Sequence, residues 1–335
     1  MNRRWQLVRL PAAAIVAADF ELVHEPVRPP ADGEALLRTI YLSLDPYQRS
    51  WMAGAAGYGT PPRPGDTPIG RAISEVVQSR DPRLAAGDVV LGETGWQSRP
   101  TARAEGLQRL DPTLGPLSTH VGVLGSPGLT AWVGMTDLCR PRAGETVLVS
   151  AAGGAVGSVA GQIAAMQGAR VVGVAGAADK CARVVTEFGF AACLSHRDPA
   201  FAASLARACP EGIDAYFDNT GGPVTTAAWA HLRHGARVAL CGLVAEYGHG
   251  DVAGPSLRHL LAKRASVAGF SVRENLHRMP QYRQQAATWI RAGRLRYAED
   301  IAQGIEQAPA AFAALLSGAT FGKCLVQVAP EREPA

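Results

Sequence analysis

The pattern of apolar and polar residues changes near residue 120. Before that point, short apolar runs alternate with Pro and Gly, as at residues 35–41, 73–78 and 88–91. Short strands separated by frequent turn residues are typical of a β-rich domain. The pattern therefore predicts a β-rich N-terminal domain.

From residue 144 onward, strand-like and helix-like segments alternate regularly. The expected helices include residues 155–166 and 179–188, and helical stretches lie between most of the remaining strands. Such alternation indicates an α/β domain with a parallel, doubly wound sheet and right-handed crossovers. The expected strands are 146–150, Arg170–Ala175, 191–194, Ile213–Asp218, 237–241 and 266–270.

The pattern of apolar and polar residues changes again in the C-terminal part, after a helix that runs through about residues 289–292. A short helix is expected at residues 309–317 and a terminal strand at 322–328. We expect that strand to return to the first domain. The α/β domain, residues 121–300, is then inserted between two parts of the β-rich one, residues 1–120 and 301–335.

Composition indicates a packed protein rather than a disordered chain. Of 335 residues, 47% are hydrophobic and 19% are charged. The net charge of +4 is scattered, without the block of like charges that marks a nucleic-acid arm, so anionic small molecules fit better as partners than nucleic acid. Neither a run of about 18 apolar residues nor a signal peptide is apparent, so we expect no membrane segment and a cytoplasmic location.

Cysteine and histidine usage argues against a metal site. The six cysteines are widely spaced without a C-x-x-C pair, which is typical of reduced, mostly buried thiols in a cytoplasmic protein. The first 120 residues contain no cysteine, and their only histidines are His24 and His120. A catalytic zinc needs three protein ligands. We therefore expect no metal.

The strongest local motif follows the first strand of the α/β domain. Residues 147–158 read V-L-V-S-A-A-G-G-A-V-G-S, with Ala152, Gly154 and Gly157 at the three positions of a dinucleotide fingerprint. Gly154 would allow the backbone to approach the pyrophosphate, and Gly157 would allow close packing of helix and strand. The N-terminus of the following helix would face the phosphates.

The second strand of this domain indicates which nicotinamide coenzyme is bound. NAD enzymes usually place an acid near the end of this strand to bind the ribose hydroxyls. Here the strand runs into Ala175 and Gly176 without an acid at its tip. Basic side chains follow instead, so NADP(H) is favoured over NAD(H). These basic residues are Lys180, Arg183, His196 and Arg197.

Two tyrosines are candidates for the chemistry. Hydride transfer to an activated C=C bond produces an enolate, which needs hydrogen-bond donors and a proton. Tyr47 lies in the motif of residues 41–49, and Tyr247 follows a predicted strand end; each is either such a donor or an amphipathic packing residue. Cys241 is either a reactive thiol or a packed strand-end residue. No G-x-S-x-G elbow of a serine hydrolase is present.

These motifs together carry a family resemblance. The chain resembles the zinc-independent prostaglandin reductase / alkenal double-bond reductase group of the medium-chain dehydrogenases/reductases, to which bacterial curcumin reductases are similar. The resemblance covers nearly the whole chain. Its motifs lie at residues 42–49, 87–92, 95–97, 124–131, 151–158, 217–222 and 241–242.

The resemblance implies a GroES-like domain beside a Rossmann domain, with the site in the cleft between them, and a homodimer. It implies NADPH-dependent reduction of the C=C bond of α,β-unsaturated aldehydes or ketones, with hydride going to the β-carbon and a proton to the α-carbon. Tyr247 would be the proton donor or the partner of the enolate. The implied coenzyme contacts are Ala155, Val156, Gly157 and Ser158 at the pyrophosphate, Lys180 at the 2′-phosphate, Asn219 near the ribose or nicotinamide, and Cys241, Gly242, Tyr247, Phe270, Ser271 and Val272 along the coenzyme.

The chain departs from the family pattern at three places. His196 replaces a tyrosine near the adenosine 2′-phosphate, which suggests an altered and pH-dependent phosphate affinity. Thr320 replaces an asparagine in the C-terminal N-L-G-K stretch. Residues 54–66 form an atypical loop that we expect to shape the substrate entrance. The substrate itself is left open, and a quinone reductase or a non-catalytic NADPH-binding protein are the alternative interpretations.

Overall fold

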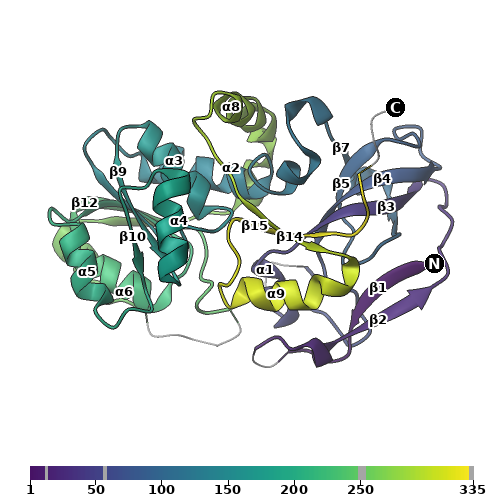
Figure 1. The fold of residues 1–335 in the computed structure, drawn as a ribbon, viewed down its shortest axis with the longest axis horizontal. Helices are drawn as coiled ribbons and strands as arrows, with labels where there is room; N and C mark the ends of the chain where they lie inside the picture. The colour runs from purple at the N-terminus through teal and green to yellow at the C-terminus, as the bar shows by residue number, and fades with distance from the viewer. Residues whose placement is uncertain (12–13, 56–58, 248–253, 332–335) are drawn as a thin grey trace. The chain divides into compact units, whose positions relative to one another are not determined.

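The chain folds into two compact units. The computed structural model describes residues 1–11, 14–55, 59–247 and 254–331. One unit comprises Met1–Val121 and Glu299–Ala335, and the other comprises Gly122–Ala298 (Figure 1). The first is β-rich and the second contains a parallel sheet with helices, which confirms the predicted fold class.

The second unit is built on a parallel sheet of six strands. The strand order is β10-β9-β8-β11-β12-β13, and every neighbouring pair is parallel. Counted from β8, this order is 3-2-1-4-5-6, the order of a dinucleotide-binding Rossmann fold. The strands are β8 (Thr146–Val149), β9 (Arg170–Ala175), β10 (Ala192–Ser195), β11 (Ile213–Asp218), β12 (Leu232–Leu240) and β13 (Ser266–Gly269).

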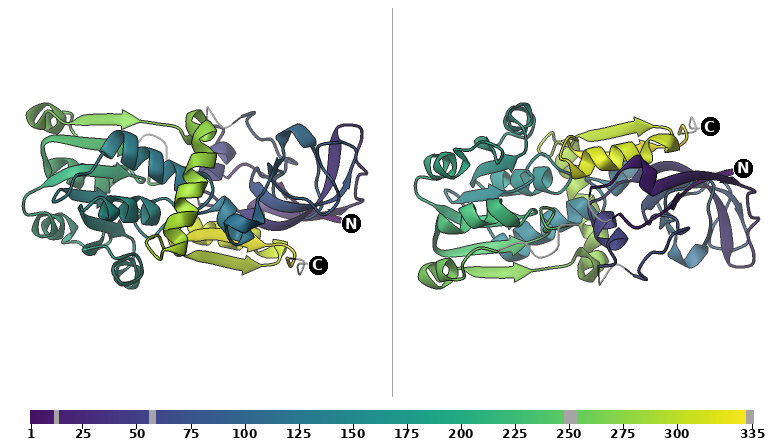
Figure 2. Two further views of the ribbon diagram at one scale, coloured as in Figure 1. Left: turned by 90° about the horizontal axis from the view of Figure 1, so that it is seen from above. Right: turned by 90° about the horizontal axis from the view of Figure 1, so that it is seen from below.

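Helices cover both faces of this sheet (Figure 2). On one face, Leu148 and Val172 pack with Phe201 of α5 and Trp229 of α6 in a single apolar core. Gly173 points to the opposite face, because successive residues of a strand alternate. The helices of the unit are α2 (Ser126–Val133), continued by a π-helix (Gly134–Cys139), α3 (Gly157–Met166), α4 (Ala178–Phe188), α5 (Phe201–Ala208), α6 (Gly222–Ala230), α7 (Arg258–Lys263), a 3-10 helix (Val272–Arg278) and α8 (Met279–Arg291).

Small residues bring α3 onto its face of the sheet. A Cβ atom at Gly161 would lie only 1.9 Å from the ring of Phe190, and one at Gly173 would lie 2.8 Å from the Cβ of Ala152. The ring of Phe190 therefore packs directly on the backbone of α3, and the same ring lies 3.1 Å from a Cβ at Gly173 in β9. The contact between Ala152 and Gly173 places the turn that precedes the helix directly on β9.

The first unit is organised around a seven-stranded sheet. Its main path is β14-β15-β3-β4-β5-β7, and β6 pairs with β3. Helix α1 (Tyr47–Met52) follows β3, and α9 (Ala308–Leu316) precedes β15. The strands are β3 (Glu34–Ser43), β4 (Arg71–Ser79), β5 (Val89–Glu93), β6 (Thr101–Arg103), β7 (Gln108–Arg109), β14 (Glu299–Gln303) and β15 (Lys323–Gln327).

The C-terminal strand returns to the first unit, as predicted. Leu325 of β15 lies opposite Ser43 of β3 in an antiparallel register. The preceding strand, β14, pairs in parallel with β15 and was not anticipated. Its sequence, E-D-I-A-Q, lacks the apolar runs that mark the other strands, because it lies at the edge of the sheet.

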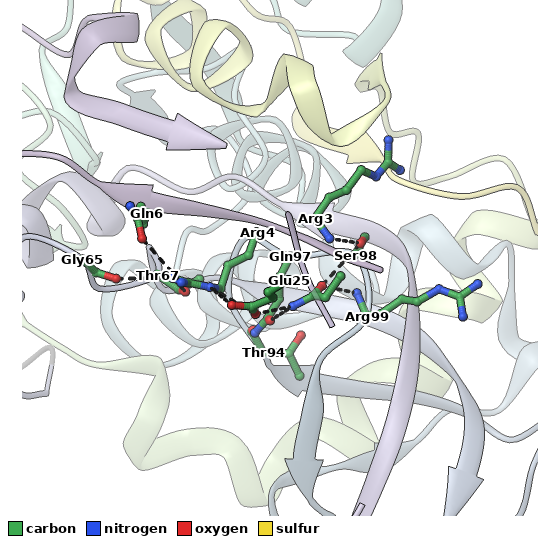
Figure 3. Close-up of polar contacts among 11 residues, drawn as sticks. Arg3, Arg4, Gln6, Glu25, Gly65, Thr67, Thr94, Gln97, Ser98 and Arg99 are labelled. Atoms are coloured by element: carbon green, nitrogen blue, oxygen red, sulfur yellow. Dashed lines mark hydrogen bonds and ion pairs between the residues drawn. The ribbon is translucent and has the colours of Figure 1, made fainter. Parts of the chain in front are cut away.

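A buried asparagine anchors the N-terminal hairpin of β1 (Asn2–Leu7) and β2 (Phe20–Glu25). The Asn2 amide nitrogen donates to Glu25 Oε1 at 3.0 Å and to Gln97 Oε1 at 2.9 Å, and its oxygen accepts from the Arg99 backbone at 2.8 Å (Figure 3). The hairpin is therefore fixed to the segment that follows β5. Below it, Phe20 stacks on the buried ring of Trp96.

The described helices include none that is both long and apolar enough to cross a membrane. All six cysteines are free thiols, four of them buried and two, Cys193 and Cys241, partly buried. Part of the predicted entrance loop, residues 56–58, lies outside the described residues.

Candidate coenzyme and catalytic site

The predicted coenzyme residues of the second unit gather at one edge of its sheet. Because all six strands are parallel, their carboxyl ends lie along the same edge, where open α/β sheets bind ligands. Each strand end is followed directly by a residue of the candidate site. These residues are Ser150 after β8, Gly176 after β9, His196 after β10, Asn219 after β11, Cys241 after β12 and Phe270 after β13.

The turn between β8 and α3 has the shape of a dinucleotide-binding loop. Ala151 has a left-handed backbone (φ +49°), and Gly154 donates its N–H to the Ala151 carbonyl at 2.9 Å. A Cβ at Gly157 would lie 2.4 Å from the same carbonyl oxygen. Glycine is thus required where helix and turn meet, as the fingerprint predicts.

Helix α3 begins two residues later than predicted, at Gly157, because Ala155 and Val156 belong to the turn. Ser158 is buried in the first helical turn. The first N–H groups of a helix lack acceptors within it, and the helix dipole is positive there. With Gly154 and Gly157 lacking side chains, this cradle fits the pyrophosphate of a dinucleotide.

Basic groups surround the end of β9. A Cβ at Gly176 would lie 3.5 Å from His196 Nε2 and 3.5 Å from Arg197 Nε. Lys180 occupies the first turn of α4 and adds its positive charge to the surroundings of His196. The structure therefore brings three of the predicted basic residues together, where an NAD enzyme usually carries an acid. Arg183 instead pairs with Glu187 one turn further along α4, at 2.6 Å.

A buried carboxylate organises the adjoining ends of β8 and β11. Asp218 is fully buried. It accepts hydrogen bonds from Ser150 Oγ (3.1 Å), Tyr216 OH (2.8 Å), the backbone N–H of Thr220 (2.9 Å) and Gly221 (3.1 Å), and Thr225 Oγ1.

The same network holds Asn219, which was predicted to contact the coenzyme. Its backbone N–H donates to Ser150 Oγ at 2.8 Å, and its side-chain amide donates to the Ser150 carbonyl at 2.7 Å. These bonds tie the two central strands together at the topological switch point. Asn219 therefore has a structural task at this edge in addition to any coenzyme contact.

Tyr247 folds back over the end of β12. Its hydroxyl lies 3.5 Å from the backbone nitrogen of Leu243 and 3.5 Å from the position of a Cβ at Gly242. Gly242 also approaches the Asn219 carbonyl, 3.4 Å from that Cβ position. Tyr247, Gly242 and Asn219 therefore lie close together, although the sequence analysis assigned each of them to the site on its own.

Cys241 has the character of a packed residue rather than a nucleophile. Burial, with the neighbouring Asp218 carboxylate and the Cys139 thiol, raises the pKa of Cys241 to about 12. The thiolate is the reactive form of cysteine. The sequence left open whether Cys241 is a reactive thiol or a packed strand-end residue, and these surroundings favour the packed residue.

The segment after β13 borders this region. The ring of Phe270 packs edge-on against Phe217 of β11, and a Cβ at Gly134 would lie 2.9 Å from it. Ser271 caps the following 3-10 helix by accepting from Arg273 N at 3.3 Å, and Val272 is the first residue of that helix.

Tyr47 and Thr320 belong to the first unit. Tyr47 begins α1 and donates its hydroxyl to Glu93 Oε1 at 3.2 Å. Burial and the nearby carboxylates of Asp45 and Glu93 raise the pKa of Tyr47 well above its usual value, so its phenol keeps its proton. Thr320 is buried three residues before β15.

A buried lysine secures the loop that carries Tyr47, and sequence reasoning missed it. Lys323 Nζ donates to the Leu44 carbonyl at 2.6 Å, to Asp45 Oδ1 at 3.0 Å and to the Cys324 carbonyl at 3.1 Å. Its side chain is only 4% exposed. The G-K pair at residues 322–323 was visible in the sequence, but nothing in the sequence indicated that the ammonium would point inward.

Comparison with known proteins identifies the family. The model described as "N-terminal domain of oxidoreductase" matches residues 3–110, and "Zinc-binding dehydrogenase" matches residues 155–290. The NADPH-dependent curcumin reductase of Escherichia coli (strain K12) is 40% identical, covering 98% of this chain and 97% of its own. The chain belongs to the curcumin, alkenal and prostaglandin reductase group of the medium-chain dehydrogenases/reductases.

Two further relatives extend this group assignment. The 2-alkenal reductase (NADP(+)-dependent) of Nicotiana tabacum is 37% identical, covering 94% of each chain. The crystal structure of CurA in complex with NADPH from Vibrio vulnificus has a TM-score of 0.92 and 37% identity, covering 98% of this chain and all of that one. The predicted family is therefore confirmed. Within the described residues of this reductase, no three His, Cys, Asp or Glu side chains are grouped to hold a metal.

Proposed function

We propose that this protein is an NADPH-dependent ene-reductase that reduces the C=C bond of α,β-unsaturated aldehydes or ketones. The observation that carries the proposal is the carboxyl edge of the parallel sheet. A dinucleotide turn follows β8 at this edge, and a cluster of basic residues follows β9 and β10. The chain that carries both features belongs to this reductase family. The turn suits a pyrophosphate and the cluster suits a 2′-phosphate.

The coenzyme-binding residues divide into three groups along this edge. The turn of residues 154–158 holds the pyrophosphate, and Lys180 with His196 holds the 2′-phosphate. Asn219, Cys241, Gly242 and the segment 270–272 line the nicotinamide half. Thr320, in the first unit, stays a predicted coenzyme contact. When bound, NADPH supplies the hydride that the β-carbon of the substrate accepts.

The two tyrosines are the candidates for stabilising the enolate and for supplying the proton. Accepting a hydride at the β-carbon places negative charge on the carbonyl oxygen of the substrate, and a hydrogen-bond donor stabilises that charge. We assign this role to the Tyr247 hydroxyl, which lies at the end of β12 beside Gly242. Tyr47 is the second candidate, because its surroundings keep its phenol protonated. The α-carbon then receives a proton from one of these phenols or from water, without a metal.

The second unit has features that suit a homodimer. Strand β13 is an edge strand, with β12 as its neighbour on one side. Leu257 and Leu261 lie one helical turn apart at α7, and they are 72% and 83% exposed. Exposed apolar side chains at this spacing favour association. Light scattering of the purified protein tests this assignment, and we propose that the dimer acts in the cytoplasm.

Steady-state oxidation of NADPH with matched acceptors tests the function. An enone, its saturated analogue and a quinone are compared under the same conditions. We expect turnover with the enone, none with the saturated ketone, and little with the quinone. Turnover of quinones alone would make the protein a quinone reductase, and NADPH binding without any turnover would favour a non-catalytic role.

A further inference from the structure

The residue after β9 is a glycine, Gly176, and the imidazole of His196 lies beside it. Gly176 has no Cβ, and the place of that atom is 3.5 Å from His196 Nε2 and 3.5 Å from Arg197 Nε. The backbone of His196 is held beside the end of β9, because His196 N donates to the Ala175 carbonyl at 3.0 Å. Ser195 Oγ also donates to the Gly176 carbonyl at 3.1 Å, which joins the two strand ends.

The charges around His196 are mainly positive. Arg197 faces it from the same loop and Lys180 from α4, and both lower the pKa of the imidazole, after partial burial, which is the larger cause. Asp198 is on the same loop, but its carboxylate accepts from Ala200 N at 2.8 Å at the start of α5. Without a ligand, the imidazole therefore favours its neutral form near neutral pH.

A phosphate monoester reverses this balance. It carries roughly −1.5 to −2 charges at pH 7 and accepts several hydrogen bonds. An anion within a few ångströms of an imidazole favours the protonated ring. Neutral imidazole can donate through only one nitrogen, whereas the protonated ring donates through both and adds a charge-assisted bond.

We propose that His196 binds the 2′-phosphate of NADPH in its protonated form, so that coenzyme binding takes up a proton and NADPH selectivity increases as pH falls through neutrality. The proposal deepens the proposed function and depends on it only for the identity of the coenzyme. Arg197 and Lys180 provide permanent charge at the same phosphate. His196 adds the part that depends on pH.

The direction of the effect follows from linkage. A group whose pKa rises on binding makes the complex more stable as pH falls toward the pKa of the free protein. NADH lacks the 2′-phosphate, so its affinity should not follow the same dependence. The phosphate itself titrates near pH 6. The comparison is therefore made between pH 8.5 and 6.5 and against a variant that keeps every other group.

Calorimetric binding of 2′,5′-ADP tests the proposal without any acceptor substrate. Titrations at pH 7.0 in buffers of different ionisation enthalpy give the number of protons exchanged. We expect the wild-type protein to take up measurably more protons than His196→Gln, and the two proteins to exchange equal numbers with 5′-ADP. The ratio of NADH to NADPH dissociation constants should rise about three- to tenfold between pH 8.5 and 6.5 in the wild type, and less than about twofold in His196→Gln.

Equal proton numbers for the two proteins with 2′,5′-ADP would overturn the proposal. So would a selectivity ratio with the same pH dependence in both. NADH affinity reports on the intact fold, and His196→Asn replaces His196→Gln if the first variant changes it. Because no reduction is measured, a protein that fails to reduce enones can still pass this test, and an active ene-reductase can fail it.

Discussion

The hydroxyl of Tyr247 lies 3.5 Å from the backbone nitrogen of Leu243, within the turn that follows β12. This places a phenol at the same sheet edge as the dinucleotide turn. For Tyr247→Phe we expect kcat to fall by about 10²-fold, the lower end for general acid catalysis, because water can replace part of the proton supply. The dissociation constant of NADPH should change little. Unchanged turnover would remove Tyr247 from the chemistry.

Tyr47→Phe is the matched variant in the first unit. It removes the hydroxyl that donates to Glu93 at 3.2 Å. If Tyr247 is the principal donor, Tyr47→Phe should lower kcat less than Tyr247→Phe, and kinetics of both variants with one enone decide the order. A larger loss for Tyr47→Phe would transfer the main role to Tyr47.

Gly157→Ala should damage coenzyme binding and stability together. The added Cβ would lie 2.4 Å from the Ala151 carbonyl oxygen, so the helix or the turn must move. We expect about 1–3 kcal/mol less stability, as for an overpacked site, and a weaker NADPH complex. Urea unfolding and fluorescence titration measure both. Gly106→Ala is the control, because its Cβ would meet nothing within 4 Å; equal effects would contradict the turn's special role.

Lys180→Ala should weaken NADPH much more than NADH. The lost charge-assisted contact is worth about 1.5–3 kcal/mol, or about 10- to 100-fold in affinity. Dissociation constants for the two coenzymes provide the test. Arg207→Ala serves as a control, since Arg207 lies in the last turn of α5, toward the opposite edge of the sheet. Equal losses for NADPH and NADH in Lys180→Ala would refute the phosphate assignment.

Cys241 should resist alkylation at neutral pH. With its pKa raised to about 12, almost none of the thiol is ionised at pH 7.5, and the thiolate fraction increases about tenfold per pH unit above that. We expect iodoacetamide to label Cys241 slowly, as measured by mass spectrometry of peptides, and Cys241→Ser to keep most of the activity. Rapid labelling at pH 7.5 would show a reactive thiol instead.

Lys323→Met should destabilise the first unit. The change leaves Asp45 and two backbone carbonyls without the buried ammonium that they share. Breaking a buried ion pair typically costs about 3–5 kcal/mol. Urea unfolding should show a loss near the lower value, whereas Lys263→Met, at the end of α7, should stay within about 0.5 kcal/mol. A loss below that limit for Lys323→Met would contradict its structural role.

The sequence predicted those parts of the fold that depend on local pattern. Strands buried between two helical layers are nearly continuous apolar runs, as in residues 147–149 and 171–175. Parallel strands place their carboxyl ends at one edge, so His196, which follows a predicted strand, could be assigned to the coenzyme site, whereas Asn219 was assigned through the family resemblance. The glycine spacing of residues 152–157 specified the turn.

Features that depend on residues far away along the chain could not be predicted from the sequence. Strand β14 is mostly polar, and it forms because its backbone pairs with the edge of β15. Lys323 and Asn2 are polar residues whose burial depends on partners many residues away. The contact of His196 with Gly176 required the end of β10 to lie beside the end of β9, which only the folded sheet provides.

Transfer of a labelled hydride tests the central claim most directly. The protein is incubated with an enone and NADPH deuterated at the transferable C4 position, and the product is examined by NMR. The proposed function predicts a saturated ketone with deuterium at the β-carbon. An allylic alcohol with deuterium at the carbonyl carbon would contradict it and would make the protein a carbonyl reductase.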